Sequence, residues 1–164
     1  MKRTRLLAIM ALFIAIGTLG SHLLWFPAGV AKAYPVQHAV NVLAAVTLGP
    51  LPATAIAFII GLLRNLLGFG TLLAFPGGVI GAFLAGVLYV KFGRKIWAAV
   101  GEVVGTGVIG ALFAVPFAKI LMGSAAGAFF FIPPFLISSL TGAAIAWMIL
   151  ARVKQKNLLQ NLKL

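Results

Sequence analysis

The sequence has no cysteine and almost no acidic side chains. Of its 164 residues only Glu102 is acidic, and 9% of the chain is charged. A soluble domain has about 25% charged residues, so this chain has too little polar surface for a soluble enzyme. Without cysteine it has no disulfide framework and no thiol nucleophile. It also lacks the common zinc-protease, serine-hydrolase and nucleotide-binding motifs. We therefore predict no enzyme activity, no metal site and no cofactor.

What the sequence has in place of charge is apolar side chains, which make up 63% of it. Such a composition excludes disorder and predicts an integral membrane protein, with residues 1–164 forming a single membrane domain. The net charge of +12 could indicate a nucleic-acid partner. The basic residues, however, lie in short clusters between long apolar runs and not on one soluble face. We interpret them as signals of membrane topology and predict no nucleic-acid binding.

Glycine and proline divide the long apolar stretches into helices. A spanning helix needs about 20 apolar residues, and residues 33–90 hold Arg64 as their one charged side chain before Lys91. The breaks must therefore come from turn chemistry, such as Gly-Pro-Leu-Pro at 49–52. The fold expected is all-α, a compact bundle of six transmembrane helices. Their expected ranges are near 5–25, 36–49, 51–68, 76–91, 96–118 and 132–151.

The basic residues predict the orientation of this bundle. A six-helix arrangement places Lys32 and Lys119 on one side and ten basic residues on the other. A bias of this kind marks the cytoplasmic face, so we expect both termini in the cytoplasm and a multi-pass protein of the cell membrane. The first segment also resembles a signal peptide, but its apolar run is too long for one. The ten are Lys2, Arg3, Arg5, Lys91, Arg94, Lys95, Arg152, Lys154, Lys156 and Lys163.

Polar side chains inside apolar helices are expensive in lipid and therefore informative. Gln37, His38 and Asn41 open the second expected helix within an arc of about 100°. Arg64 and Asn65 lie near the outer end of the third. These five groups fall at one depth and favour a polar pocket below the outer face. The alternative is that each makes a separate structural hydrogen bond.

Several polar and aromatic residues have alternative interpretations. Arg64 could hold the carbonyl groups of the nearby loop or pair with Glu102. Glu102 could instead meet Arg94 or Lys95 at the inner rim. The hydroxyl groups of the sixth helix are expected to bond their own backbone, and two aromatic residues near the outer face are expected to be interfacial anchors. These residues are Ser138, Ser139, Thr141, Trp25 and Tyr34.

Four strings contain these polar positions: Tyr-Pro-Val-Gln-His at 34–38 with Asn41, Leu-Leu-Arg-Asn-Leu-Leu-Gly at 62–68, Leu-Ala-Phe-Pro-Gly-Gly at 73–78, and Gly-Glu at 101–102 with Gly-Thr-Gly at 105–107. Together they resemble the ThiW family, thiazole-specific substrate-binding (S) components of energy-coupling factor (ECF) transporters. The resemblance covers roughly residues 5 to 150. It implies six helices with both termini inside, and a ligand captured from outside below the loops between helices one and two, three and four, and five and six.

The resemblance also implies a ligand and partners. The ligand is hydroxyethylthiazole, a precursor of thiamine, and the partners are a transmembrane coupling protein and two ATPase subunits. Ala11 and Ala15 resemble the AxxxA pattern through which S components dock, although small residues there could also pack inside the bundle. The substrate-binding residues that the resemblance implies are Tyr34, Gln37, His38, Asn41, Arg64, Asn65, Phe75 and Glu102.

Three alternative functions stay open at this point. The ligand could be thiamine or its pyrimidine precursor, although cationic thiamine would favour more acidic contacts than Glu102 offers. The chain could be a membrane scaffold whose polar residues only join helices. It could also be a stand-alone secondary transporter, which the absence of a carboxylate pair disfavours.

Overall fold

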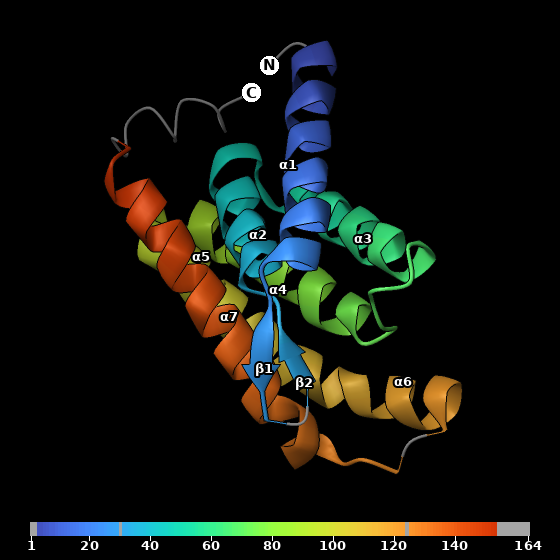
Figure 1. Ribbon diagram of the computed structural model, residues 1–164. Helices are drawn as coiled ribbons and strands as arrows, with labels where there is room; N and C mark the ends of the chain where they lie inside the picture. The colour runs from blue at the N-terminus through green and yellow to red at the C-terminus, as the bar shows by residue number, and fades with distance from the viewer. Residues whose placement is uncertain (1–2, 30, 124, 154–164) are drawn as a thin grey trace.

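The computed structural model describes residues 3–29, 31–123 and 125–153, which form a bundle of helices with one short hairpin at one end (Figure 1). Helices α5, η1 and α6 follow one another without a break, so the described chain has six continuous helical segments. The helices are α1 (Arg3–Leu23), α2 (Pro35–Leu48), α3 (Pro50–Leu66), α4 (Ala74–Phe92), α5 (Lys95–Val104), the π-helix η1 (Gly105–Gly110), α6 (Ala111–Met122) and α7 (Ala128–Ala151).

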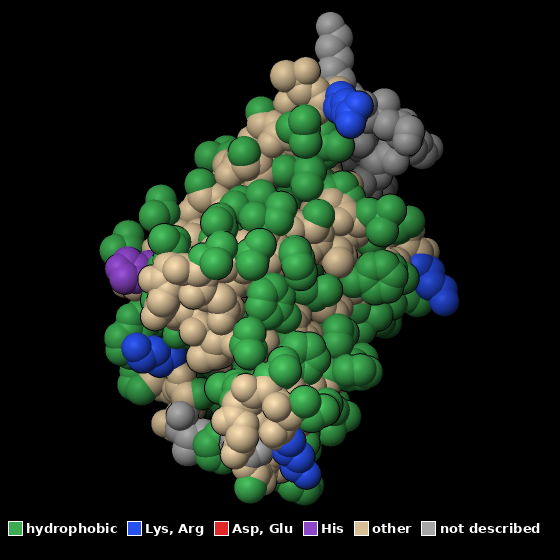
Figure 2. Space-filling model, turned by 90° about the vertical axis from the view of Figure 1, so that its right-hand side faces the viewer, with side chains coloured by type: hydrophobic (Ala, Val, Ile, Leu, Met, Phe, Trp, Pro, Cys, Tyr) green, Lys and Arg blue, Asp and Glu red, His purple; other side chains and the backbone are tan. Residues whose placement is uncertain are grey.

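Four of these segments are long and apolar enough to cross a membrane: α1, α4, the continuous segment Lys95–Met122, and α7. The helices α2 and α3 are apolar but shorter. Hydrophobic side chains cover most of the face in Figure 2, which shows a few basic groups and no acidic one. Because such a surface is stable only in an apolar medium, the chain is a helical membrane protein.

The short helix α2 lies at the centre of the bundle. It packs against α1, α3, α4, α5 and α7, and most of its residues are buried. It ends at Gly49, whose φ of 87° is rarely adopted by other residues, and Pro50 then begins α3. The Gly-Pro break expected from the sequence therefore separates two helices by a single residue and lets α3 run in a different direction from α2 (Figure 1).

Small residues allow α4 to pack directly on the continuous segment. A Cβ atom added to Gly101 would lie 2.7 Å from the Cα atom of Ala85, and one added to Gly105 would lie 2.8 Å from the Cα atom of Gly81. Real Cβ atoms do not approach so closely, so this backbone contact requires glycine. This close contact fixes where Thr106 and Glu102 lie along the axis of α4.

Two helix ends differ from the sequence-based expectation. The helix α7 begins at Ala128 and not near residue 132, and it passes through Pro133 and Pro134. Packing overrides the weak helix propensity here, because Phe131 and Pro134 are both buried. The fifth helix likewise continues past Lys119 to Met122.

The connection between α1 and α2 forms an antiparallel hairpin that the sequence did not predict. Its strands are β1 (Phe26–Ala28) and β2 (Ala31–Ala33), with Phe26 opposite Ala33. The hairpin lies at one end of the bundle, near the start of α7 (Figure 1). At the other end, Lys95 Nζ donates to the carbonyl oxygen of Leu150 at 2.7 Å, which joins the start of α5 to the end of α7. The start of α1 points toward that same end.

Candidate ligand-binding cavity

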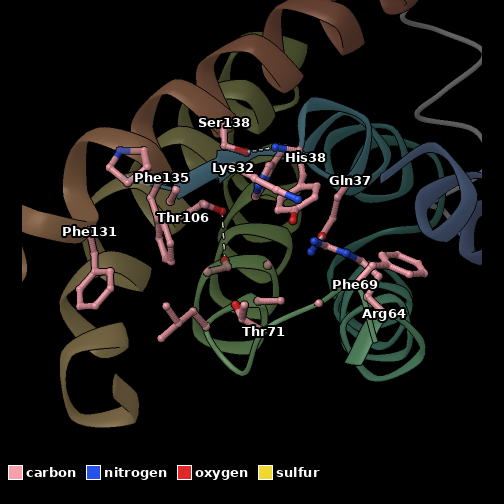
Figure 3. Close-up of a pocket in the computed structure, with 18 of the residues that line it drawn as sticks. Lys32, Gln37, His38, Arg64, Phe69, Thr71, Thr106, Phe131, Phe135 and Ser138 are labelled. Carbon is pink, nitrogen blue, oxygen red and sulfur yellow. Dashed lines mark hydrogen bonds between the residues drawn. The ribbon is translucent and has the colours of Figure 1, made fainter. Parts of the chain in front are cut away.

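A cavity of about 440 Å³ opens at the hairpin end of the bundle. The hairpin and the loop after α3 enclose it with the helix ends beside them, together with residues of α7 and Thr106 of η1. In Figure 3, Arg64, Gln37 and Phe69 lie on one side and Phe131 and Phe135 on the other. Residues near the hairpin that line it are Ala31, Lys32, Tyr34, Gln37 and His38; from α3 to α4 they are Arg64, Gly68, Phe69, Gly70, Thr71, Leu73, Ala74, Gly77 and Gly78; from α7 they are Phe130, Phe131, Pro134, Phe135 and Ser138.

Arg64 is a buried cation in the cavity wall, with 2% of its surface exposed. Its Nη1 donates to Oε1 of Gln37, and its Cζ lies 3.8 Å from the ring centroid of Tyr34. Its backbone carbonyl accepts hydrogen bonds from the amides of Phe69 and Gly70, at 3.1 and 2.9 Å. The loop after α3 therefore holds the backbone of Arg64, while a neutral amide and an aromatic face hold its side chain.

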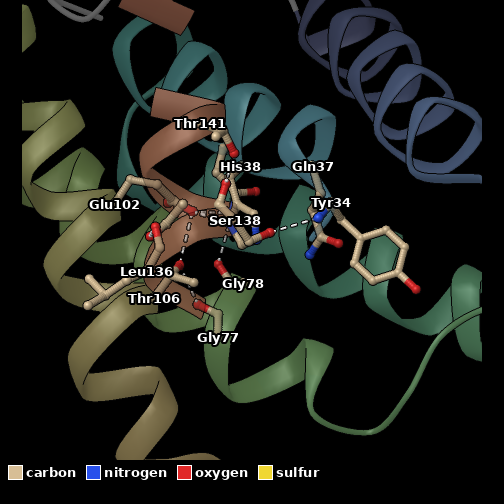
Figure 4. A network of polar contacts seen from close by, with 12 residues as sticks. Tyr34, Gln37, His38, Gly77, Gly78, Glu102, Thr106, Leu136, Ser138 and Thr141 are labelled. Carbon is tan, nitrogen blue, oxygen red and sulfur yellow. Dashed lines mark hydrogen bonds and ion pairs between the residues drawn. The ribbon is translucent and has the colours of Figure 1, made fainter. Parts of the chain in front are cut away.

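Glu102 is fully buried below the cavity floor and accepts several hydrogen bonds (Figure 4). Its Oε1 lies 2.7 Å from His38 Nδ1, 3.1 Å from Asn41 Nδ2 and 3.0 Å from Thr106 Oγ1. Because the amide nitrogen of Asn41 can only donate, Oε1 is an acceptor, and we therefore assign a proton to Nδ1 of His38. Thr106 Oγ1 is also 3.0 Å from the carbonyl oxygen of Gly77, which ties η1 to α4.

A second set of contacts attaches the hairpin to the bundle. The backbone amide of Tyr34 donates to Ser138 Oγ at 2.8 Å, across the boundary between the hairpin and α7 (Figure 4). Lys32 Nζ lies 3.9 Å from the centroid of the Trp25 ring. These contacts place Tyr34 and Lys32 at the cavity.

Four of the eight expected substrate-binding residues line the cavity, namely Tyr34, Gln37, His38 and Arg64. The other four do not line it. Asn41 and Glu102 lie below it and hold His38 in place. Their position makes them supports for a lining residue.

Asn65 and Phe75 lie away from the cavity. Asn65 Nδ2 donates to the carbonyl oxygens of Gly61 at 2.8 Å and Thr71 at 3.1 Å, so it anchors the loop after α3. Phe75 packs on Phe58, with ring centroids 5.4 Å apart.

The alternatives for Glu102 and Arg64 are resolved by these contacts. The suggestion that Glu102 meets Arg94 or Lys95 is wrong, because Glu102 bonds His38 and Lys95 bonds the end of α7. The suggestion that Arg64 pairs with Glu102 is also wrong, since its partners are Gln37 and Tyr34.

The hydroxyl groups of α7 divide into two kinds. Ser139 and Thr141 bond their own backbone as expected, whereas Ser138 accepts a hydrogen bond from the hairpin. From the sequence, Ser138 was expected to bond its own helix backbone, so it was not predicted to be a site residue.

Several other lining residues were also missed as site residues. Phe69, Phe130 and Phe131 lie in glycine-rich, aromatic segments between the expected helices, and that density of aromatic residues is the sequence signal that could have found them. No sequence pattern around Thr106 or Phe135 indicates a binding site, because both residues reach the cavity through helix packing. The described residues contain no group of three His, Cys, Asp or Glu side chains that could hold a metal ion.

The fold and the cavity define a class: a helical membrane protein with a cavity of ligand size that is lined by both polar and aromatic side chains. The family model described as thiamine-precursor transporter protein (ThiW) matches residues 7–156. The chain therefore belongs to the ThiW family, which confirms the resemblance found in the sequence. No curated protein and no solved structure gave a significant match.

Proposed function

We propose that this chain is the S component of an ECF transporter, and that it captures hydroxyethylthiazole in the cavity at the hairpin end. The observation that carries this proposal is the make-up of the cavity: aromatic side chains face hydrogen-bonding side chains across about 440 Å³. A small heterocycle with one hydroxyl group needs both kinds of wall. Membership of a family of thiamine-precursor transporters supports the same class of ligand.

The two walls suggest how the ligand lies. Phe131 and Phe135 offer faces on which a thiazole ring can stack. On the other side, His38 and Gln37 can bond a ring nitrogen or the hydroxyl group. Cationic thiamine, the second candidate, would meet Lys32 and Arg64 in the wall, and no acidic side chain lines the cavity among the described residues.

The distribution of charge supports an outward-facing cavity. Lys95 and the end of α7 lie together at the opposite end of the bundle, toward which α1 begins. Basic residues gather there, and basic residues mark the cytoplasmic side. We infer that all six helical segments belong to the membrane bundle, that both termini are cytoplasmic and that the ligand enters from outside the cell membrane. Lys2, Lys154, Lys156 and Lys163 of this cluster lie outside the described residues.

The exposure of α1 supports docking on a coupling protein. Ala11 and Ala15 are exposed on α1, whereas Thr18 on the same face is buried against the bundle. Small exposed side chains permit close approach of another helix. We propose that this surface contacts the coupling protein, which acts with two ATPase subunits, because this chain has no nucleotide-binding motif of its own.

Equilibrium binding to the purified protein tests the ligand. Hydroxyethylthiazole, thiamine and the pyrimidine precursor should be titrated in parallel. We expect saturable binding of the thiazole and weaker binding of the other two. Tightest binding of thiamine or of the pyrimidine would overturn the thiazole assignment, and no binding of any of them would favour a scaffold.

The variant Ala11→Trp tests docking. A bulky side chain should block helix approach, so ATP-driven uptake should be lost while the isolated protein binds its ligand normally. Leu12→Trp is a matched control on the neighbouring exposed position. Uptake that survives Ala11→Trp would show that this face contacts only lipid, and uptake without the ATPase subunits would indicate a secondary transporter.

A further inference from the structure

The cavity is electropositive, with no acidic side chain in its wall. Arg64 and Lys32 both line it, and Glu102, the one acidic residue of the whole chain, lies below it. Glu102 is engaged with His38, which lines the floor. Because Glu102 does not line the cavity, Arg64 and Lys32 are the charged side chains that a ligand in it would contact.

Arg64 lacks an anionic partner among the described residues, although only 2% of its surface is exposed. Its observed partners, Gln37 and the ring of Tyr34, are neutral. Its Nε has no hydrogen-bond partner in the described part of the chain. Buried charges in proteins are normally paired, because removing an ion from water is unfavourable. A buried guanidinium that lines a cavity and has only neutral partners is therefore a candidate contact for an anionic ligand.

The N-terminal end of α4 adds to the positive electrostatic potential in the cavity. Ala74, Gly77 and Gly78 of its first turns line the cavity. The N-terminal end of a helix has a partial positive charge and favours anions. This end and the guanidinium of Arg64 border the same space (Figure 3), so both act on a ligand in the same direction.

We propose that this site takes a thiamine-related heterocycle that bears an anionic group, a carboxylate or a phosphate ester, with Arg64 as its charged contact. The heterocycle rests on the proposed function, whereas the charge rests on the cavity itself. Arg64 is already removed from water in the fold, so an anion gains a charge-assisted hydrogen bond without ordering the arginine. A neutral hydroxyl group gains a weaker bond.

A set of ligands with matched rings tests this proposal on the purified full-length protein. For the thiazole ring the set is hydroxyethylthiazole, its phosphate ester, its acetate analogue and its aminoethyl analogue. For the pyrimidine ring it is the hydroxymethyl precursor and its phosphate ester. We expect at least one anion to bind about tenfold tighter than its neutral parent, and the amine to bind weakest. Comparison of the phosphate with the acetate identifies which anion fits.

Variants of the basic residues link the preference to Arg64. Arg64→Gln should bring the ratio of anionic to neutral affinity close to one, and Arg64→Lys should retain part of it. Lys32→Gln should lower the ratio less, because Lys32 is exposed. Lys119→Gln is the matched control: it removes an exposed cation of α6 that does not line the cavity, so the ratio should stay unchanged.

The outcomes separate this inference from the proposed function. If neutral hydroxyethylthiazole binds as tightly as both of its anions, the charge inference fails and the thiazole function stands. If an anionic pyrimidine binds and no thiazole does, the thiazole function fails and the charge inference stands. If no ligand binds, both are overturned. If Arg64→Gln leaves the ratio unchanged, Arg64 is not the anion contact; if this variant does not fold, the ratio in the unaltered protein decides.

Discussion

The two charged centres of the cavity, at its floor and in its wall, are built in opposite ways. Glu102 at the floor is bonded by His38, Asn41 and Thr106, all through one carboxylate oxygen. Arg64 in the wall has only neutral partners and an unbonded Nε among the described residues. The comparison teaches that burial alone does not tell a structural charge from a binding charge. The partners do: Glu102 Oε1 has three polar partners within the fold, whereas Arg64 has no acidic partner in the described part of it and lines the cavity. Each group also keeps one buried atom, Glu102 Oε2 and Arg64 Nε, without a hydrogen bond among the described residues.

Removal of the floor carboxylate should have the largest effect on stability. Glu102→Leu leaves His38, Asn41 and Thr106 without their shared acceptor in a buried site. We expect the free energy of unfolding to fall by about 3–5 kcal/mol, measured by denaturant or thermal unfolding in detergent. Glu102→Gln keeps an acceptor oxygen and should lose less. Equal stability of Glu102→Leu and the parent would show that the network contributes nothing to the fold.

The matching change in the wall should have a smaller effect on stability. Arg64→Met removes a buried cation that lacks an anionic partner and leaves Gln37 Oε1 without its donor. We expect a loss of about 1–3 kcal/mol in the free energy of unfolding, measured in the same way. A loss as large as that of Glu102→Leu would make Arg64 a structural residue and remove the contrast between wall and floor.

At the floor, His38 lines the cavity, whereas Asn41 lies behind it and only supports the network. His38→Gln should weaken ligand affinity by a few-fold to tenfold, about 0.5–1.5 kcal/mol, because a hydrogen bond to the ligand is lost. Asn41→Ala is the control, since Asn41 donates to Glu102 and Gly78 and does not line the cavity. It should lower stability more than affinity. The reverse pattern would move the ligand toward Asn41.

The smallest effect concerns the loop after α3, which lines the wall beside Arg64. We expect this loop to close over the ligand, so a spin label at Leu67→Cys should become less mobile when ligand is added. The chain has no cysteine, so a single label is possible without other changes. A label at Lys91→Cys, at the other end of α4, should not respond. Unchanged mobility at residue 67 with saturating ligand would argue against a lid.

The composition and the Gly-Pro breaks were sufficient to predict a helical membrane protein, and the polar positions in the second and third helices were found from the sequence. Both inferences rest on local physics: the transfer of about 20 apolar residues into lipid, and the conformational limits of glycine and proline. The same reasoning found Arg64 and His38, because a polar group in an apolar helix stands out within its own segment.

The partners of those polar groups were decided only by the tertiary structure. His38 and Glu102 are 64 residues apart in the chain, and their contact depends on how α2 and α5 pack on α4. From the sequence, Glu102 could contact the ligand or meet Arg94 or Lys95 at the inner rim, because a sequence indicates height along one helix but not the rotation of one helix relative to another. The aromatic wall has the same origin, since Phe131 and Phe135 reach the cavity through the packing of α7. Local periodicity thus determined which side chains are polar and buried, while helix packing determined that Glu102 is paired and Arg64 is left open.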